Sequence, residues 1–500
     1  MNLRRDLPLL AIAMLAAPLL TGQLGWLTSK NDDFVPKNRL SGIGVDRQEM
    51  SDAVLARRTE LMIESQTFSI MRDPQALAGA GRITSPAMKK IFRAASEKSG
   101  LPASLIAAVA YLESWGDPKA ESPAGPRGIM QFSEATAKRS GLKVVHSTRY
   151  RVTSERKKVK TRKGMVWKTV KHKVPYTVTV RDERLQPEKA VPAAAVYLAQ
   201  MEKKFGGRDW AVFAYHCGEG CVAEFQATAR EIGALGKEPV SVARVFFAGS
   251  PARNKDLYQL IRRHMERDFS PTYWFRITRA EQLLALYEKE PAEFRSLLAD
   301  YRNEDNPSQR APHRLSVWLK AADFAFQTCD DIRKDQGKHL VKALDDPKLF
   351  GFALRKSGAG AIGEDDLNNQ AYYLQASPAA IGTLAYIAFE TRRLHAAMKP
   401  KGEAYVAFDV TGLVRPMDVS KKAKGETISH CTGQVFDIAY SNLPPAEREA
   451  LQFVLDDLGW NGYLGFVEES PNSGTLHIGC SPTSRDFFTR VFEEAANLKG

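Results

Sequence analysis

The chain has 500 residues, of which 44% are hydrophobic, and it carries a formal net charge of +13 at pH 7. One hydrophobic core rarely organises a chain of this length, so the length argues against a single-domain protein and favours two or three domains. The hydrophobic fraction is sufficient for each domain to bury a packed core.

The N-terminus combines two basic residues with an apolar run. Arg4 and Arg5 precede an uncharged stretch from Leu7 to Trp26, which is the layout of a secretory signal or of an uncleaved N-terminal anchor. The length of this stretch lies near the lower limit for a bilayer span. We therefore expect residues 1–28 to direct export to the periplasm or cell envelope, and we leave open whether they stay as an inner-membrane anchor.

The cysteines all lie in the part of the chain that would be exported, where disulfides can form. The sequence does not reveal their pairing, although two of them are only four residues apart. Disulfides and free buried thiols are both open for Cys217, Cys221, Cys329, Cys431 and Cys480.

A spacer and a leading helix are predicted over residues 29–84. The spacer is polar and contains Pro and Gly, and a helical pattern follows at 52–70. A second helical pattern spans 85–99, with Ser85-Pro86 as its start signal and Gly100 as its stop.

The next helix ends in a carboxylate. Leu105, Ile106 and Val109 recur at helical spacing, so Glu113 closes a buried helix just before the helix breakers at 116–118. Partial desolvation at such a rim raises the pKa of a carboxyl group and allows it to donate a proton near neutral pH. Glu113 is thus a candidate general acid, and the alternative is a solvated or capping side chain.

Three short motifs carry a family resemblance. They are Glu113-Ser114, Ser122-Pro-Ala-Gly125-Pro-Arg-Gly128-Ile-Met130-Gln131, and Ala214-Tyr215-His216-Cys217-Gly218. In this order and separation they resemble the soluble lytic transglycosylases, lysozyme-like enzymes that cleave the glycan strands of peptidoglycan. The resemblance covers residues 85–235.

The resemblance implies a reaction and a set of site residues. Glu113 would protonate the glycosidic oxygen of the β-1,4 bond between N-acetylmuramic acid and N-acetylglucosamine. Once ionised, Glu113 would remove the proton of the C6 hydroxyl to give a 1,6-anhydro end, without a cofactor. The alternatives are a muramidase that uses water, and a peptidoglycan-binding scaffold without activity. The implied substrate-contact residues are Ser114, Ser122, Gly128, Met130, Gln131, Tyr215 and His216.

The chain departs from the family pattern in its sugar-binding wall. His216 stands where the family usually has Asn, and Ala190-Val191 replaces an Asn-Ile pair. We leave open whether His216 contacts sugar or packs against a helix.

A basic β-hairpin is predicted between the loop motif and that wall. Residues 151–180 alternate and are rich in Val and Thr, so two strands that meet near Lys163-Gly164 are expected, within an insertion at 143–184. This insertion has fourteen Lys or Arg and three acidic residues, a net charge of +11. Its partner would be an anionic envelope polymer, wall-peptide carboxylates or a lipid surface. The alternative is a solvated insertion, and export argues against nucleic acid.

Helices are predicted for most of the chain up to a linker. Residues 187–205 and 209–224 read as helices that complete the lysozyme-like domain. Residues 236–370 read as a helical extension that ends in a Gly-rich linker at 356–369.

The last part of the chain contains three candidate metal ligands. A helix after Ser377-Pro378 precedes a strand at 404–413, and His430, Asp437 and His477 follow. Two imidazoles and one carboxylate on Zn²⁺ leave a position open for water, as a hydrolytic zinc site requires.

With this spacing of ligands, residues 371–500 resemble the zinc D-Ala-D-Ala carboxypeptidases and dipeptidases. The resemblance implies that Arg415 contacts a peptide substrate. In that group a catalytic Glu stands three positions before the last His, and this chain has Gly474 there, with Glu468 and Glu469 nearby. An active peptidase, a metal- or peptide-binding module and a purely structural domain all stay open.

These expectations together describe a multidomain, mainly α protein. A lysozyme-like α domain with an inserted basic hairpin leads through a helical middle region to a C-terminal α+β domain. Peptidoglycan glycan strands and stem peptides are the expected partners.

Overall fold

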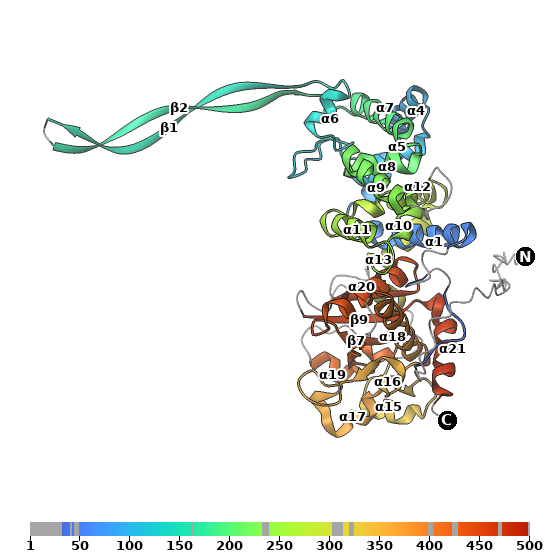
Figure 1. The fold of residues 1–500 in the computed structure, drawn as a ribbon. Coiled ribbons are helices and arrows are strands. Elements are labelled where there is room, and N and C mark those ends of the chain that lie inside the picture. The colour runs from blue at the N-terminus through green and yellow to red at the C-terminus, as the bar shows by residue number, and fades with distance from the viewer. Residues whose placement is uncertain are drawn as a thin grey trace, which may run out of the picture.

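The computed structural model (Figure 1) describes residues 33–40, 43–44, 50–162, 164–232, 240–302, 314–319, 325–398, 404–422, 429–468 and 473–498. The apolar N-terminal segment, the hairpin residue Lys163 and Glu469 lie outside these ranges. Within them, none of the helices has both the length and the apolar character needed to cross a bilayer.

The first helices lead to the end of the Glu113 helix. Ser85 caps α4 by accepting the N–H of Met88, and Gly100 ends it with a φ of 76°, as the sequence predicts. The helices are α1 (Asp52–Ser65), α2 (Thr67–Met71), α3 (Ala76–Ile83), α4 (Pro86–Ser99), α5 (Ala103–Ser114) and α6 (Glu134–Arg139).

A long two-stranded antiparallel hairpin follows α6 and projects away from the rest of the molecule (Figure 1). Its strands are β1 (Val144–Thr161) and β2 (Gly164–Asp182), so the hairpin is longer than the predicted strands at each end. The predicted turn at Lys163-Gly164 agrees with the register, in which Thr161 is opposite Gly164.

The chain then returns to the helical region. The expected helix over 209–224 is divided at Gly218, whose φ of 90° disfavours other residues. The helices are α7 (Pro187–Phe205), α8 (Arg208–Cys217), α9 (Glu219–Ile232), α10 (Val242–Ala248), α11 (Lys255–Arg267), α12 (Tyr273–Lys289), α13 (Pro291–Arg302) and α14 (Arg314–Leu319). α5 packs against α4 and α12, which places the Glu113 end of α5 beside the start of α12.

The C-terminal region is α+β and contains a five-stranded sheet in the order β4-β6-β7-β9-β8. β4 and β6 pair in parallel, and the other pairs are antiparallel. The strands are β4 (Phe352–Leu354), β6 (Phe408–Gly412), β7 (Val435–Ala439), β8 (Leu464–Glu468) and β9 (Thr475–Cys480). The main helices are α18 (Pro378–Met398), α20 (Pro445–Trp460) and α21 (Arg485–Ala496).

Two expectations about the approach to this region need correction. β3 (Val341–Lys342) and β4 interrupt the stretch expected to be helical up to residue 355, because strands of two and three residues leave no readable periodicity. The Gly-rich stretch at 356–369 is not merely a linker, since Ile362 is buried in the C-terminal core.

The expected N-terminal spacer also packs against this core in its described part. Phe34 and Ile43 are buried there, and the N–H of Phe34 donates to the carbonyl oxygen of Leu349. A buried ion pair between Arg58 of α1 and Asp457 of α20 further connects the helical and C-terminal regions. The fold is therefore multidomain and mainly α, as predicted.

Candidate functional site

Glu113 lies in the last turn of α5. The helix stops because Trp115 adopts a left-handed φ of 53° and Gly116 follows with a φ of 72°. The half-buried carboxyl of Glu113 accepts a hydrogen bond from the hydroxyl of Tyr273, the first residue of α12. Two segments 160 residues apart in sequence thus meet at this carboxyl.

The surroundings of Glu113 set its ionisation. Burial raises the pKa of the Glu113 carboxyl above its usual value, although His216, the Tyr273 hydrogen bond and Arg276 act in the opposite direction. Burial likewise raises the pKa of the Tyr273 and Tyr215 hydroxyls, so both stay neutral donors. Desolvation dominates at Glu113, and its carboxyl can therefore hold a proton at a higher pH than an exposed glutamate.

No pattern in the sequence marks Tyr273 or Arg276 as residues of a functional site. Neither residue belongs to a recognised motif, and Ser270-Pro271 predicts only that a helix starts there. The buried Nε of Arg276 has no hydrogen-bond partner within the described ranges. Only the packing of α12 against α5 reveals that both residues belong to the Glu113 site.

The structure answers in part whether His216 contacts sugar or packs against a helix. Its exposed ring stacks on that of Tyr273, with centroids 4.4 Å apart and an interplanar angle of 9°. Its Nε2–H donates to the carbonyl oxygen of Asp268 at 3.2 Å. His216 therefore packs against the residue that hydrogen-bonds Glu113, while its exposure also leaves it accessible to a sugar.

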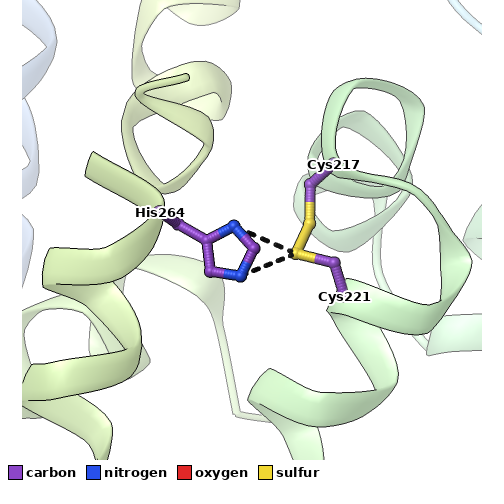
Figure 2. A group of neighbouring side chains, drawn as sticks. All are labelled: Cys217, Cys221 and His264. Atoms are coloured by element: carbon purple, nitrogen blue, oxygen red, sulfur yellow. Dashed lines mark hydrogen bonds between the residues drawn. A yellow bond between two sulfur atoms is a disulfide. The ribbon is translucent and has the colours of Figure 1, made fainter. Parts of the chain in front are cut away.

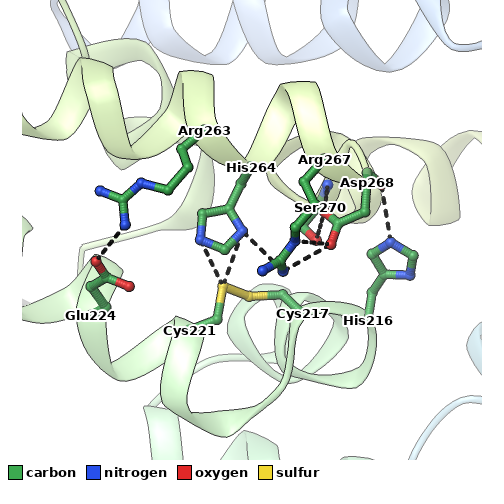
Figure 3. The surroundings of a disulfide bond; sticks show 9 residues. All are labelled: His216, Cys217, Cys221, Glu224, Arg263, His264, Arg267, Asp268 and Ser270. Atoms are coloured by element: carbon green, nitrogen blue, oxygen red, sulfur yellow. Dashed lines mark hydrogen bonds and ion pairs between the residues drawn. A yellow bond between two sulfur atoms is a disulfide. The ribbon is translucent and has the colours of Figure 1, made fainter.

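A disulfide follows His216 directly. Cys217 and Cys221 are bonded across the break between α8 and α9, and the ring of His264 lies 3.8 Å from the sulfur of Cys221 (Figure 2). Around this bond, Arg267 and Ser270 contact the carboxylate of Asp268, whose carbonyl holds His216 (Figure 3). The other three cysteines, Cys329, Cys431 and Cys480, are free thiols.

The loop motif is held together by hydrogen bonds to its backbone. The hydroxyl of Ser114 donates to the carbonyl oxygen of Ile129 (2.8 Å), and that of Tyr215 donates to the carbonyl oxygen of Met130 (2.7 Å). The amide nitrogen of Gln131 donates to Gly128 (2.9 Å) and to Ala120 (3.2 Å).

The residues predicted to contact substrate therefore differ in their accessibility. Ser114, Gly128 and Met130 are buried. Ser122, Gln131 and Tyr215 are partly exposed, and Ser122 lies where the loop turns back, its N–H bonded to the carbonyl oxygen of Pro126. The structure brings Glu113, Tyr215 and His216 together around Tyr273 and places Arg415 in the C-terminal region.

Gly128 joins the loop to the root of the hairpin. Its φ is 78°, and a Cβ at this position would lie 1.9 Å from the carbonyl oxygen of Arg184. The buried guanidinium of Arg184 pairs with Asp182 and donates to the carbonyl oxygen of Phe132. The insertion is thus anchored on the same loop that supports Tyr215.

Comparison with known proteins identifies this helical region. The family described as Transglycosylase SLT domain matches residues 90–158 and 165–234, which include Glu113, the loop motif and Tyr215. The two matched stretches, residues 90–158 and 165–234, thus correspond to an SLT transglycosylase domain. This finding confirms the family predicted from the three motifs.

Individual relatives match the same region. The chain is 33% identical over 144 residues to a peptidoglycan transglycosylase, gp16, of Escherichia phage T7, a match that covers 29% of this chain and 8% of the relative. It is 30% identical over 140 residues to membrane-bound lytic murein transglycosylase F 2 of Alkalilimnicola ehrlichii, covering 28% of this chain and 30% of the relative. A 57-residue match at 42% identity to membrane-bound lytic murein transglycosylase F of Alcanivorax borkumensis covers 11% and 12%. The chain thus spans less than a third of the length of each of these relatives.

A second cluster lies far from the SLT domain in sequence. His430 is the first residue of η5 (His430–Thr432), Asp437 lies on β7, and His477 lies directly opposite Asp437 on β9. The Nε2 of His430 is 2.9 Å from Oδ2 of Asp437, and the Nδ1 of His477 is 2.7 Å from Oδ1. The three candidate ligands therefore converge, with ligand atoms within 4.8 Å of one another.

The remaining ring nitrogens show that this donor set fits a cation. The Nδ1 of His430 is 2.6 Å from the carbonyl oxygen of Leu413, which can only accept, so this nitrogen carries a proton. The Nε2 of His477 is 2.7 Å from the hydroxyl of Ser429. Such outer partners orient metal-binding imidazoles and direct their other nitrogens inward. At 2.9 Å and 2.7 Å from the carboxylate oxygens, the inward nitrogens of His430 and His477 donate hydrogen bonds to Asp437, and a bound cation would replace the protons of these bonds.

The carboxyl of Asp437 in this cluster has its pKa shifted in the opposite direction to that of Glu113. Burial alone would raise the pKa of Asp437, but the charges and hydrogen bonds of His430 and His477 outweigh it and hold the pKa well below its usual range. Asp437 is therefore ionised, as a metal ligand must be.

A pocket of about 250 Å³ borders the cluster and is lined by His430, Asp437 and Arg415 among others. The Arg415 guanidinium pairs with Asp365 at its rim. Glu468 accepts hydrogen bonds from the Tyr440 hydroxyl (3.3 Å) and from the N–H of Gly474 (3.4 Å), so its carboxylate is already engaged beside Gly474.

Proposed function

We propose that the SLT domain is a lytic transglycosylase that cleaves the β-1,4 bond between N-acetylmuramic acid and N-acetylglucosamine in peptidoglycan. The observation that carries this proposal is a single carboxyl, Glu113, with a raised pKa and a neutral hydroxyl donor. The groups that shift its pKa are Tyr273, His216 and Arg276, with no second carboxylate among them. Paired-carboxylate glycosidases need such a second group.

One carboxyl then serves both steps. Protonated Glu113 gives its proton to the glycosidic oxygen as the bond from that oxygen to C1 breaks, and the acetamido oxygen of the same sugar bonds to C1. The Glu113 carboxylate next removes the proton of the C6 hydroxyl, and O6 displaces the acetamido oxygen at C1. The product is a 1,6-anhydro end, no water is consumed, and Glu113 regains its proton.

The residues around Glu113 assist through position and charge. The Tyr273 hydroxyl orients the carboxyl and stabilises its ionised form between the two steps, and Arg276 adds a nearby positive charge. The loop from Ser122 to Gln131, which Tyr215 fastens through Met130, forms the adjoining wall for sugar.

Mass spectrometry of muropeptides released from purified sacculi tests this proposal. Wild-type protein should release fragments with anhydro ends, which are lighter by one water than hydrolysed ends, and Glu113→Gln should release none. Hydrolysed ends that incorporate isotopically labelled water would show a muramidase instead. Absence of release by the wild type would favour a binding scaffold.

We also propose that the protein works in the cell envelope. Two relatives carry the description membrane-bound, and the basic, apolar N-terminus has the layout of an export segment. Fractionation of cells that express the full chain tests this location, and recovery in the cytoplasm alone would contradict it.

A second function is favoured by the convergence of His430, Asp437 and His477. We propose that they hold Zn²⁺ through Nε2, the carboxylate and Nδ1, and that the adjoining pocket binds the stem peptide, with Arg415 facing its carboxylate. A bound Zn²⁺ supplies a Lewis acid that polarises a peptide carbonyl. Gly474 leaves no glutamate at the usual position of the base, so the chain's own residues favour peptide binding over rapid cleavage.

Zinc stoichiometry of the purified protein tests this second function. One zinc per chain is expected for wild type and for the control His339→Ala, a half-buried histidine on the carboxylate of Asp335 outside the cluster. His430→Ala should lose the metal. Equal zinc content in wild type and His430→Ala would rule out the site.

A further inference from the structure

The hairpin of β1 and β2 has two chemically different faces. Residues directly opposite each other on paired strands share a face, and successive residues alternate. Lys158 is opposite Trp167 and Lys160 is opposite Met165, so these four share one face, called here the tryptophan face. On the same register this face also carries Tyr150, Val152, Arg156, Lys171 and Lys173.

The tryptophan face exposes apolar side chains to an unusual degree. Tyr150 is 65% exposed, Val152 61%, Met165 60% and Trp167 57%. The other four exposed apolar residues of the hairpin are less exposed: Val180 is 54% exposed, Val145 44%, Val166 41% and Tyr176 40%, and of these Val166 and Tyr176 lie on the opposite face. Eight of the thirteen large apolar residues that are exposed within the described ranges lie on this hairpin, which therefore has a surface that normally needs a partner.

The charges of the two faces also differ. The tryptophan face has the cations Arg156, Lys158, Lys160, Lys171 and Lys173, and its residues from Tyr150 to Pro175 include no acid. The opposite face has Glu155, which pairs with Lys157 at 3.1 Å. On the tryptophan face, Arg156 and Lys158 lie over the ring of Trp167, 5.9 Å and 5.4 Å from its centroid.

We propose that the tryptophan face binds an anionic lipid surface. A soluble polyanion would need the cations but would gain little from Met165, Val152 and Trp167. A lipid interface satisfies both groups, because aromatic and aliphatic side chains enter the boundary of the acyl chains while Lys and Arg contact the head groups.

The root of the hairpin is held to the helical region by several polar contacts, so a membrane contact of the hairpin would position that region. Lys143 and Glu183 exchange hydrogen bonds, and Arg181 and Lys189 both pair with the Glu183 carboxylate at 2.6 Å. β1 has 18 residues, which at roughly 3.3 Å per residue span about 60 Å. With its tryptophan face on a membrane, the hairpin would keep the Glu113 site within about that distance of the bound surface.

Fluorescence quenching by brominated lipids tests the proposal in the full chain. Trp167 contributes the difference between the spectra of wild type and Trp167→Phe, so the result does not depend on whether the N-terminal segment also binds lipid. Vesicles that mix brominated phosphatidylcholine with phosphatidylglycerol should quench this difference, and vesicles of brominated phosphatidylcholine alone should quench it far less. An unquenched difference spectrum in the anionic vesicles would overturn the proposal.

A matched pair of charge reversals separates a lipid surface from a soluble polyanion. Lys158→Glu with Lys160→Glu alters the tryptophan face, and Lys157→Glu with Lys168→Glu makes the same change of charge on the opposite face. Each cation near an anionic membrane increases the binding affinity about fivefold. In a lipid titration followed by Trp167 quenching, the first pair should therefore lower the affinity for the anionic vesicles more than tenfold. The second pair should have a clearly smaller effect.

Two results of this comparison would contradict the lipid assignment. Equal losses for both pairs would show that only the total charge matters. Binding of heparin or duplex DNA that depends on the tryptophan face, without Trp167 quenching by lipid, would assign the face to a soluble polyanion.

Discussion

Two carboxyl groups of this chain have their pKa values shifted in opposite directions. Glu113 is half-buried and Asp437 is buried, and burial raises the pKa of each. At Glu113 the hydrogen-bond donor is the neutral hydroxyl of Tyr273, and the nearby imidazole of His216 stacks on Tyr273 instead of bonding the carboxyl. Burial therefore dominates there, and the pKa is raised.

At Asp437 the partners are two imidazoles that contact both carboxylate oxygens directly. Their charges and hydrogen bonds outweigh burial, and the pKa is lowered. The difference shows that the direct donors, and not burial alone, decide whether a carboxyl can act as an acid or as an anionic ligand. Substitutions at and around the two carboxyl groups test this contrast, from the largest expected change in free energy to the smallest.

Glu113→Gln should have the largest effect. Removing the proton donor should reduce the release of muropeptides from sacculi by about 10³-fold, while zinc content stays unchanged. Glu97→Gln, an exposed glutamate on α4, serves as the control and should leave release unaltered. Activity of Glu113→Gln within a factor of a few of wild type would remove Glu113 from the reaction.

Asp437→Asn should destabilise the C-terminal sheet and leave glycan cleavage intact. Loss of a buried ionic partner costs about 3 kcal/mol, to be measured by hydrogen exchange of β7 and β9 in metal-free protein. Because the folded-state pKa of Asp437 is lowered, its contribution is complete at neutral pH and is lost as the pH falls below about 4. The difference from wild type should therefore shrink in acid.

The control for this variant is Asp409→Asn. Asp409 lies on β6 of the same sheet and pairs with Arg355 at 2.8 Å, but its side chain is 43% exposed. The substitution should cost less than about 1 kcal/mol. Equal effects of the two substitutions would mean that Asp437 has no special electrostatic role.

Cys217→Ser with Cys221→Ser should weaken the region that positions His216. A disulfide across so short a loop contributes about 2 kcal/mol, which urea unfolding of the oxidised protein should detect as a loss. Because Asp268 still holds His216, activity should fall only a few-fold. The free thiols allow a control, and Cys329→Ser should leave stability nearly unchanged. Loss of all activity in the double variant would show that the disulfide itself organises the site.

Tyr273→Phe should have the smallest effect in free energy, a tenfold loss of rate or about 1.4 kcal/mol, because one hydrogen bond to a charged group is lost. This hydrogen bond lowers the pKa of Glu113, so its loss should raise that pKa further. The alkaline limb of the pH–rate profile, which reports protonated Glu113, should then move to higher pH. Tyr287→Phe on the same helix should not move it, and a shift to lower pH for Tyr273→Phe would contradict the assignment.

The parts of the molecule that could be predicted are those encoded by nearby residues. The end of the Glu113 helix follows from the breakers at 116–118, and the hairpin follows from its alternation and its turn at Lys163-Gly164. The convergence of His430, Asp437 and His477 agrees with their predicted grouping, since β7 and β9 pair in a register that places Asp437 opposite His477.

The parts that could not be predicted depend on distant packing. Tyr273 reaches Glu113 only because α12 lies against α5, and no local pattern marks it. The short strand β4 and the buried Ile362 belong to the C-terminal core although their local sequence resembles a helix end and a linker. The disulfide between Cys217 and Cys221 depends on the break at Gly218, which divides a segment that reads as one helix.

Direct titration of the Glu113 carboxyl tests the central claim. In protein labelled with carbon-13 at the glutamate carboxyls, the resonance that Glu113→Gln removes can be followed with pH. We predict that it titrates clearly above the usual glutamate value of about 4.3. A midpoint at or below that value would show that burial does not prepare Glu113 to donate a proton.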